Sequence, residues 1–153
     1  MKLSINTTDL NQHAPRSPRV RLGGFVHLPR LIDKARASKD GQLGVYIYGP
    51  ESLLDMTFFE FTGIDPEAFL EYVARGEGDF AILQWVLSKS QTPLLPHQIE
   101  SWSRWLENLP GLSLEARAWF AEFASSQTPP RSDISTLFEY LDLDDYLRFG
   151  GKA

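Results

Sequence analysis

Apolar residues recur with a helical period from residue 28 to residue 149. In the segment that opens at Leu28, apolar side chains fall at i, i+3, i+4 and i+7, which makes one stripe of a helix apolar and leaves the other face polar. Comparable segments follow, separated by prolines, glycines and residues that favour helix caps. The pattern predicts helices over residues 28–37, 52–61, 66–75, 80–87, 96–108, 114–124 and 134–149.

The segment 80–87 is the most apolar of these, with Gln84 as its only polar residue. A helix that is apolar on all sides is typical of the centre of a core, so we expect the other helices to surround it, with Asp79 as its N-cap. The tryptophans also fall at helical spacing and are expected in the core: Trp85, Trp102, Trp105 and Trp119.

Residues 1–21 show no helical repeat, and Pro15 and Pro18 favour extended backbone before them. We expect an extended N-terminal arm packed on the helical body. Because side chains alternate along extended chain, Val20 and Leu22 would dock the arm while Arg19 and Arg21 face the other side.

Residues 45–48 are rich in β-branched and aromatic side chains and end at a glycine and a proline, which predicts a short strand. A strand needs a partner, either the arm or a second copy of the chain. The expected fold is therefore all-α: a single compact domain over residues 1–153, with six to seven helices, a minor β element and the arm.

Composition agrees with a globular protein, since 42% of the residues are hydrophobic and 23% are charged. The chain contains no cysteine, which excludes disulfides and thiolate chemistry. It opens without an apolar leader segment, and no window approaches the ~18 apolar residues of a membrane span. We expect a soluble cytoplasmic protein with no membrane partner.

The charge is unevenly distributed. The chain carries a net charge of −5, yet seven of its fifteen Lys and Arg residues lie between Arg16 and Lys39, where Asp33 is the only acid. The negative total disfavours nucleic acid as a partner, because that affinity depends on neutralising phosphates. A small anionic ligand remains compatible with the local basic stretch.

The basic stretch combines three features of anion sites: glycines that allow close backbone approach, a helix N-terminus, and guanidinium groups. We predict a phosphate- or carboxylate-bearing ligand at the junction of the arm and the first helix. Alternatively, the same cations pair with Asp142, Asp144 and Asp145 and only hold the arm in place. The predicted ligand-binding residues are Arg19, Arg21, Gly23, Gly24, Arg30 and Lys34.

Two further functional hypotheses stay open. His27 precedes the first helix and could act as acid or base in an enzyme for an anionic metabolite. The strand at 45–48 could instead pair with another chain, as in a protein-interaction module or a homo-oligomer. The sequence indicates no cofactor and no metal site, because His13, His27 and His97 lie far apart and no metal-binding motif is present.

The chain resembles a small bacterial family of domains of unknown function, family 5069. The resemblance rests on Pro15-Arg16-Ser17-Pro18-Arg19-Val20-Arg21-Leu22-Gly23-Gly24, on Leu28-Pro29-Arg30 with Asp33-Lys34-Ala35-Arg36-Ala37, on Phe61-Thr62-Gly63-Ile64-Asp65, and on residues 79–85. It implies relatedness over nearly the whole chain and brings with it no activity and no catalytic residues.

Overall fold

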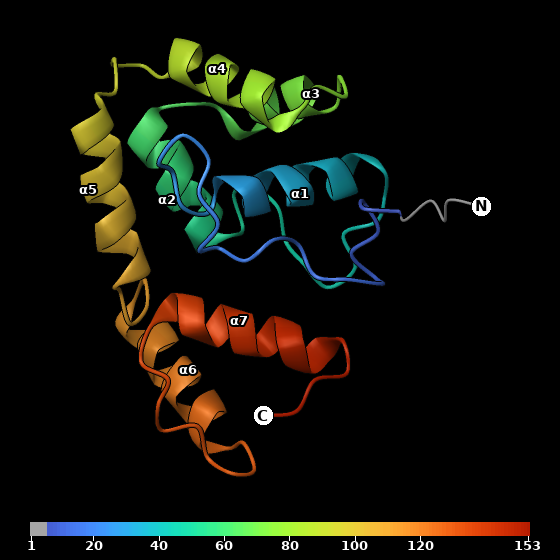
Figure 1. Ribbon diagram of the computed structural model, residues 1–153, viewed down its shortest axis with the longest axis vertical. Coiled ribbons are helices and arrows are strands. Elements are labelled where there is room, and N and C mark those ends of the chain that lie inside the picture. The colour runs from blue at the N-terminus through green and yellow to red at the C-terminus, as the bar shows by residue number, and fades with distance from the viewer. Residues whose placement is uncertain (1–5) are drawn as a thin grey trace. The chain divides into compact units, whose positions relative to one another are not determined.

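The computed structural model describes residues 6–153, and this part of the chain is all-α with seven helices, as predicted (Figure 1). No helix among these residues has both the length and the apolar character that crossing a bilayer requires. The helices are α1 (Leu28–Lys39), α2 (Leu53–Thr62), α3 (Pro66–Val73), α4 (Asp79–Lys89), α5 (Pro96–Glu107), α6 (Leu114–Ser125) and α7 (Leu137–Arg148).

Backbone contacts divide the chain into two compact units. The described part of the first unit comprises residues 6–16 and Arg30–Pro93, and the second comprises Ser17–Pro29 and Leu94–Ala153. In Figure 1 the first unit includes α2, α3 and α4, and the second includes α5, α6 and α7; the boundary falls in the first turn of α1. One domain over residues 1–153 stays a prediction, and the units are described separately below.

Helix ends follow the predicted capping chemistry at several positions. The side chain of Ser52 accepts a hydrogen bond from the backbone N–H of Asp55, and that of Asp65 accepts from Ala68. Gly63 ends α2 with φ of 72°, a left-handed conformation that favours glycine. These local signals define α2 and α3 before any tertiary contact is considered.

The core of the first unit is aromatic. The rings of Phe58, Phe59 and Phe69 meet edge to face, with centroids 5.5 to 6.2 Å apart. Trp85 contacts Phe69 and stacks on Tyr72, where the centroids are 4.8 Å apart. The predicted stripe of α1 is fully buried, which confirms the periodicity at Leu28, Leu31, Ile32 and Ala35.

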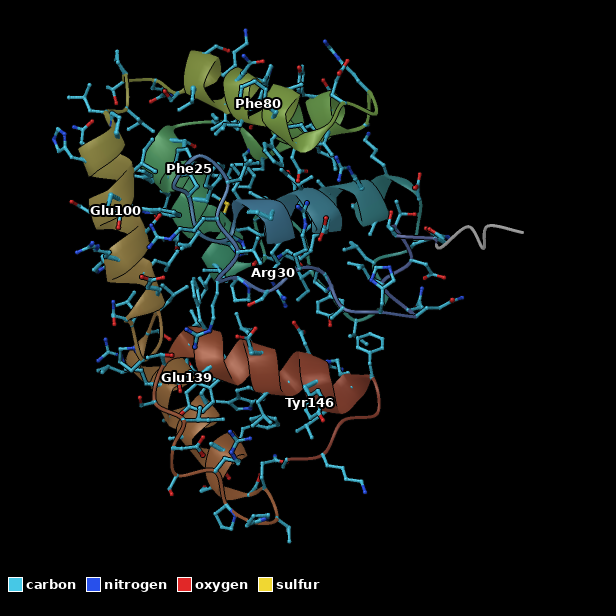
Figure 2. All side chains as sticks on the ribbon, in the orientation of Figure 1. Phe25, Arg30, Phe80, Glu100, Glu139 and Tyr146 are labelled. Carbon is cyan, nitrogen blue, oxygen red and sulfur yellow. The ribbon has the colours of Figure 1, made fainter. Side chains whose placement is uncertain are left out.

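The predicted central position of α4 is wrong. Phe80, labelled in Figure 2, is 68% exposed and Leu87 is 42% exposed, whereas Ile82, Leu83 and Val86 are buried. The helix therefore has one buried and one exposed face, and its almost uniform apolar sequence hides this division. Trp105 and Trp119 are also half exposed, so their predicted burial is wrong, while Trp102 is buried.

The predicted strand over residues 45–48 is also wrong. Gly44 and Gly49 adopt φ of 61° and 86° and turn the chain on either side of the segment. Within it, the backbone N–H of Tyr46 bonds the carbonyl of Leu43, and the Ile47 carbonyl accepts from the Lys34 ammonium. These bonds override the local β propensity. The interaction-module hypothesis thereby loses the strand on which it rested.

In the second unit, the segment before α1 packs on α5. The Phe25 ring meets Trp102 edge to face at 6.1 Å, and the Ser103 hydroxyl donates to the Gly24 carbonyl at 2.6 Å. Val20 is 41% exposed because a turn follows Ser17, where the Val20 N–H bonds the Ser17 carbonyl. Phe25 and Val26, rather than the predicted pair, provide the buried apolar contact.

Candidate functional site

Arg19 and Arg21 bind carboxylates of the second unit. Arg19 Nε lies 3.0 Å from Asp142 Oδ2, and the Ser17 hydroxyl donates to the other oxygen of the same carboxylate. This contact confirms for Asp142 the alternative in which arm cations pair with acids of the last helix. Asp144 instead pairs with Arg148 on its own helix, with Nε and Oδ2 3.1 Å apart.

Arg21 bridges two acids of α5. Its Nη1 lies 2.5 Å from Glu100 Oε2, and its Nη2 lies 3.1 Å from Glu107 Oε1. Hydrogen bonds from Arg104 and then Arg21 lower the pKa of the Glu100 carboxyl below its usual value. Glu100 is labelled in Figure 2 on the ribbon of α5. Arg19 and Arg21 thus fasten the segment before α1 to its own unit.

Gly23 and Gly24 form a two-residue hairpin turn. Both have positive φ, 58° and 85°, and Leu22 and Phe25 exchange two backbone hydrogen bonds of 3.0 Å. This geometry is that of a type I′ turn, which explains both glycines without a ligand. A Cβ added at Gly24 would also lie 3.3 Å from the side chain of Ile99.

Arg30 and Lys34 bind groups of the first unit. The buried Arg30 donates to the Arg16 carbonyl at 3.2 Å, and its guanidinium lies 5.5 Å from the centroid of the Tyr46 ring. Lys34 Nζ lies 2.6 Å from Asp55 Oδ1 in a pair that solvent hardly reaches. Each of the predicted ligand-binding cations therefore binds a different acceptor of the protein. These contacts do not bring the cations together around one anion site.

His27 is fully buried, with φ of 68° and a backbone N–H bonded to the Pro18 carbonyl at 2.9 Å. A general acid or base must reach the proton it transfers, directly or through one water. A side chain without exposed surface does not meet that condition, so the geometry disfavours the predicted catalytic role.

Arg16, which was not among the predicted residues, joins three segments of the first unit. Its Nε and Nη2 donate to Asp33, with Nη2 3.0 Å from Oδ1, and its Nη1 lies 2.6 Å from Asp79 Oδ2. The backbone N–H of Arg16 also donates to Asp33 at 2.9 Å. We call this arrangement of Arg16, Asp33 and Asp79 the Arg16 clamp, because it fixes the arm to α1 and to the start of α4.

The clamp has clear electrostatic consequences. Its hydrogen bond to Asp79 is the main reason that the pKa of the Arg16 guanidinium lies above its ordinary value. Reciprocally, the hydrogen bond from Arg16 lowers the pKa of the Asp79 carboxyl below its ordinary value. Both groups therefore stay charged near neutral pH, and the clamp, with one guanidinium against the carboxylates of Asp33 and Asp79, carries a net negative charge.

A pocket of about 390 Å³ opens beside the Arg16 clamp, between the arm, α1 and the start of α4. We call it the arm pocket. Arg36 lines it and donates through Nη2 to the Glu77 carbonyl at 3.0 Å, with Asp79 Oδ1 further away at 3.7 Å. Across residues 6–153, Nε and Nη1 of Arg36 donate to no protein acceptor. The lining residues are Thr7, His13, Ala14, Arg16, Asp33, Arg36 and Asp79.

Local signals in the sequence did not locate this pocket, because its acids bind a residue far away in the chain. Asp79 was predicted as the N-cap of α4, but Gly78 occupies that position without a side-chain bond, and Asp79 begins the helix. Its carboxylate is thereby available to Arg16. Asp33 lies within helical reach of Arg36, yet it bonds Arg16 across the chain instead. Only the fold reveals this long-range pairing.

The structure defines an all-α protein whose first unit carries a charged pocket at the junction of the arm and α1. The sequence model of a family described as a domain of unknown function (DUF5069) matches residues 12–147, and the chain belongs to that family. No curated protein matches the sequence.

Among residues 6–153, no three His, Asp or Glu side chains are grouped so that they could hold a metal ion.

Proposed function

We propose that this protein is a cytoplasmic binding module for a small metabolite with a carboxylate or phosphate group, and that the arm pocket is its site. The observation that carries the proposal is Arg36, whose Nε and Nη1 face no protein acceptor in the described chain while the group lines a pocket. A guanidinium with two such donors can bind a carboxylate or phosphate through parallel hydrogen bonds.

Arg16 and Arg36 have different roles in this proposal. Arg16 directs its side-chain donors to Asp33 and Asp79, so these two carboxylates more than offset its positive charge. Arg36 has only a distant carboxylate partner and retains most of its field toward the pocket. The anionic group of the ligand therefore binds Arg36, and Thr7 and His13, which also line the pocket, contact the rest of the molecule.

The size of the arm pocket supports a small metabolite. Its volume of about 390 Å³ lies within the roughly 300–1,000 Å³ that is typical of small-molecule sites. The lining is dominated by charged and polar side chains, which suits a ligand with several hydrogen-bonding groups. The proposed site shares no residue with the predicted one: it lies in the first unit, whereas Gly23 and Gly24 belong to the second.

Occupation of the pocket would affect the start of α4. Arg36 Nη2 and Asp79 Oδ1 are 3.7 Å apart, so an anion bound to Arg36 competes with the Asp79 carboxylate for the same charge. Asp79 then depends more strongly on Arg16. This competition couples the ligand to the position of α4 and supports a regulatory role.

A thermal-shift titration with inorganic phosphate and with citrate tests the proposal at low ionic strength. Binding to the native state must raise stability, by about 2.7 kcal/mol at a ligand concentration of 100 Kd. Arg36→Ala should abolish the rise in melting temperature, and Arg36→Lys should weaken it because lysine lacks the planar fork. Arg75→Ala is the matched control, since Arg75 is an exposed arginine of the same unit that lies over Tyr72.

The proposal fails in either of two cases. In the first, neither anion raises the melting temperature of the wild-type protein. In the second, Arg36→Ala responds to the anions as the wild type does, which would place the binding elsewhere.

A further inference from the structure

The segment between α6 and α7 folds back on α6 in the second unit. The backbone N–H of Arg131 donates to the Ala124 carbonyl at 3.0 Å, and the side chain of Gln127 donates to the Phe123 carbonyl at 3.0 Å. Arg131 is itself held by Asp133, with Nε 2.8 Å from Oδ1 and Nη2 2.7 Å from Oδ2. The position of the Arg131 side chain is therefore well defined.

This segment closes a second pocket of about 140 Å³ against α6 and α7, which we call the loop pocket. Half of the residues that line it have aliphatic side chains, namely Ala121, Ala124, Pro130 and Ile134. The polar lining residues include Arg131 and Tyr140. At roughly 30 Å³ per molecule of liquid water, the volume corresponds to a compound of about five non-hydrogen atoms.

Tyr140 is the unusual residue of the loop pocket. It is only 5% exposed, and its ring stacks on Phe120 with centroids 4.9 Å apart. Burial raises the pKa of its hydroxyl, which stays a protonated donor. In the part of the chain that the structure describes, this hydroxyl bonds no protein group. The hydroxyl is therefore available to a ligand or to water in the loop pocket.

We propose that the loop pocket binds a short-chain carboxylate, whose alkyl part packs on Ala121, Ala124 and Ile134 and whose carboxylate accepts a hydrogen bond from Tyr140. Arg131 supplies a second donor: Asp133 accepts from Nε and Nη2, and Nη1 donates to no acceptor within residues 6–153. One carboxylate oxygen can accept from the phenol and the other from Nη1. This site is separate from the arm pocket and does not depend on its function.

Butyrate is a suitable probe, because its six non-hydrogen atoms approach the size of the pocket, and butyramide is a neutral analogue of the same shape. In a ¹H–¹⁵N NMR titration of the full chain, butyrate should shift the backbone amides of residues 121–134 in a saturable way. Butyramide should bind at least 10-fold more weakly. This comparison needs no variant and so does not depend on the folding of one.

Tyr140→Phe removes the hydroxyl and keeps the ring, and it should weaken butyrate binding about 10-fold. Tyr146→Phe is the matched control. Tyr146, which is labelled in Figure 2, lies on the same helix, and its side chain is 60% exposed. Arg36→Ala should leave the butyrate-dependent shifts of residues 121–134 unchanged, which separates this result from any binding at the arm pocket. The inference is overturned if butyrate causes no saturable shifts at residues 121–134, if butyramide binds equally well, or if Tyr140→Phe binds as tightly as the wild type.

Discussion

Arg16 and Asp79 lie 63 positions apart in the chain and form a hydrogen-bonded ion pair in which Nη1 and Oδ2 are 2.6 Å apart. The same guanidinium binds Asp33 on α1. A single side chain therefore closes the first unit around the arm pocket. Its removal should loosen the arm and α4 together, even though Arg16 is only partly buried.

Arg16→Ala should lower the free energy of unfolding by about 1–2 kcal/mol, because it removes charged hydrogen bonds that solvent partly screens. Urea denaturation of the purified protein measures this change. Arg148→Ala provides a control that breaks a pair within one helix, between Arg148 and Asp144, and it should cost much less. Equal losses in the two variants would contradict the role of the Arg16 clamp.

The Asp79 carboxyl should make stability depend on acidity. Its pKa is lower in the folded protein, mainly because of the hydrogen bond from Arg16, so its contribution is present above the unfolded pKa of about 3.9. The contribution is lost as the pH falls through the lower, folded pKa. The difference in stability between the wild type and Asp79→Asn should therefore shrink below about pH 4. Urea denaturation from pH 7 to pH 3 checks this, and a difference that stays constant or grows would speak against the pairing.

The buried pair of Lys34 and Asp55 should be essential for folding of the first unit. Asp55 also accepts a hydrogen bond from the backbone of Gly49 at 2.9 Å, so Asp55→Ala removes the carboxylate beside a buried ammonium and takes the acceptor away from a backbone donor. We expect a loss of about 3–5 kcal/mol. Adding Lys34→Met should restore part of the loss, because the double variant no longer buries a single charge. Calorimetry on the two variants would show the account to be wrong if the double variant were less stable than Asp55→Ala.

The turn at Gly24 should tolerate no side chain. Gly24→Ala places a Cβ at φ of 85° and 3.3 Å from Ile99, and a left-handed conformation alone costs about 1–2 kcal/mol for other residues. We expect a loss of stability of at least that size. Gly78→Ala is the control, since Gly78 has φ of −78° and open space around it, and thermal denaturation should find only the smaller loss that alanine causes at an N-cap. If Gly24→Ala cost no more stability than Gly78→Ala, the left-handed turn would not be what requires glycine at position 24.

Local signals predicted the helices well, because capping residues and periodic apolar positions act over one or two turns. Ser52, Gly63 and Asp65 have the roles that their residue types favour. The prediction of a strand at residues 45–48 was wrong because Lys34 and the flanking glycines impose a turn. The predicted burial of Phe80 was wrong because composition alone cannot show which face of an apolar helix is exposed.

The residues of the arm pocket were not predicted, and the predicted junction at Gly23 and Gly24 belongs to the other unit. The local excess of cations correctly marked the arm and α1 as the region where charged groups gather. Their individual partners were set by residues far away in the chain, as with Arg19 and Asp142 or Arg21 and Glu100. Arg36 was distinguished only by the small number of its protein acceptors, which depends on the tertiary structure.

The most direct test of the proposed function is an NMR titration of the arginine side-chain Nε–Hε signals with inorganic phosphate. Binding at the arm pocket predicts a saturable shift of the Arg36 signal, while the signal of the exposed Arg75 moves only slightly. The result that would contradict the proposal is an Arg36 signal that does not move, or that follows Arg75, up to phosphate concentrations at which non-specific binding begins.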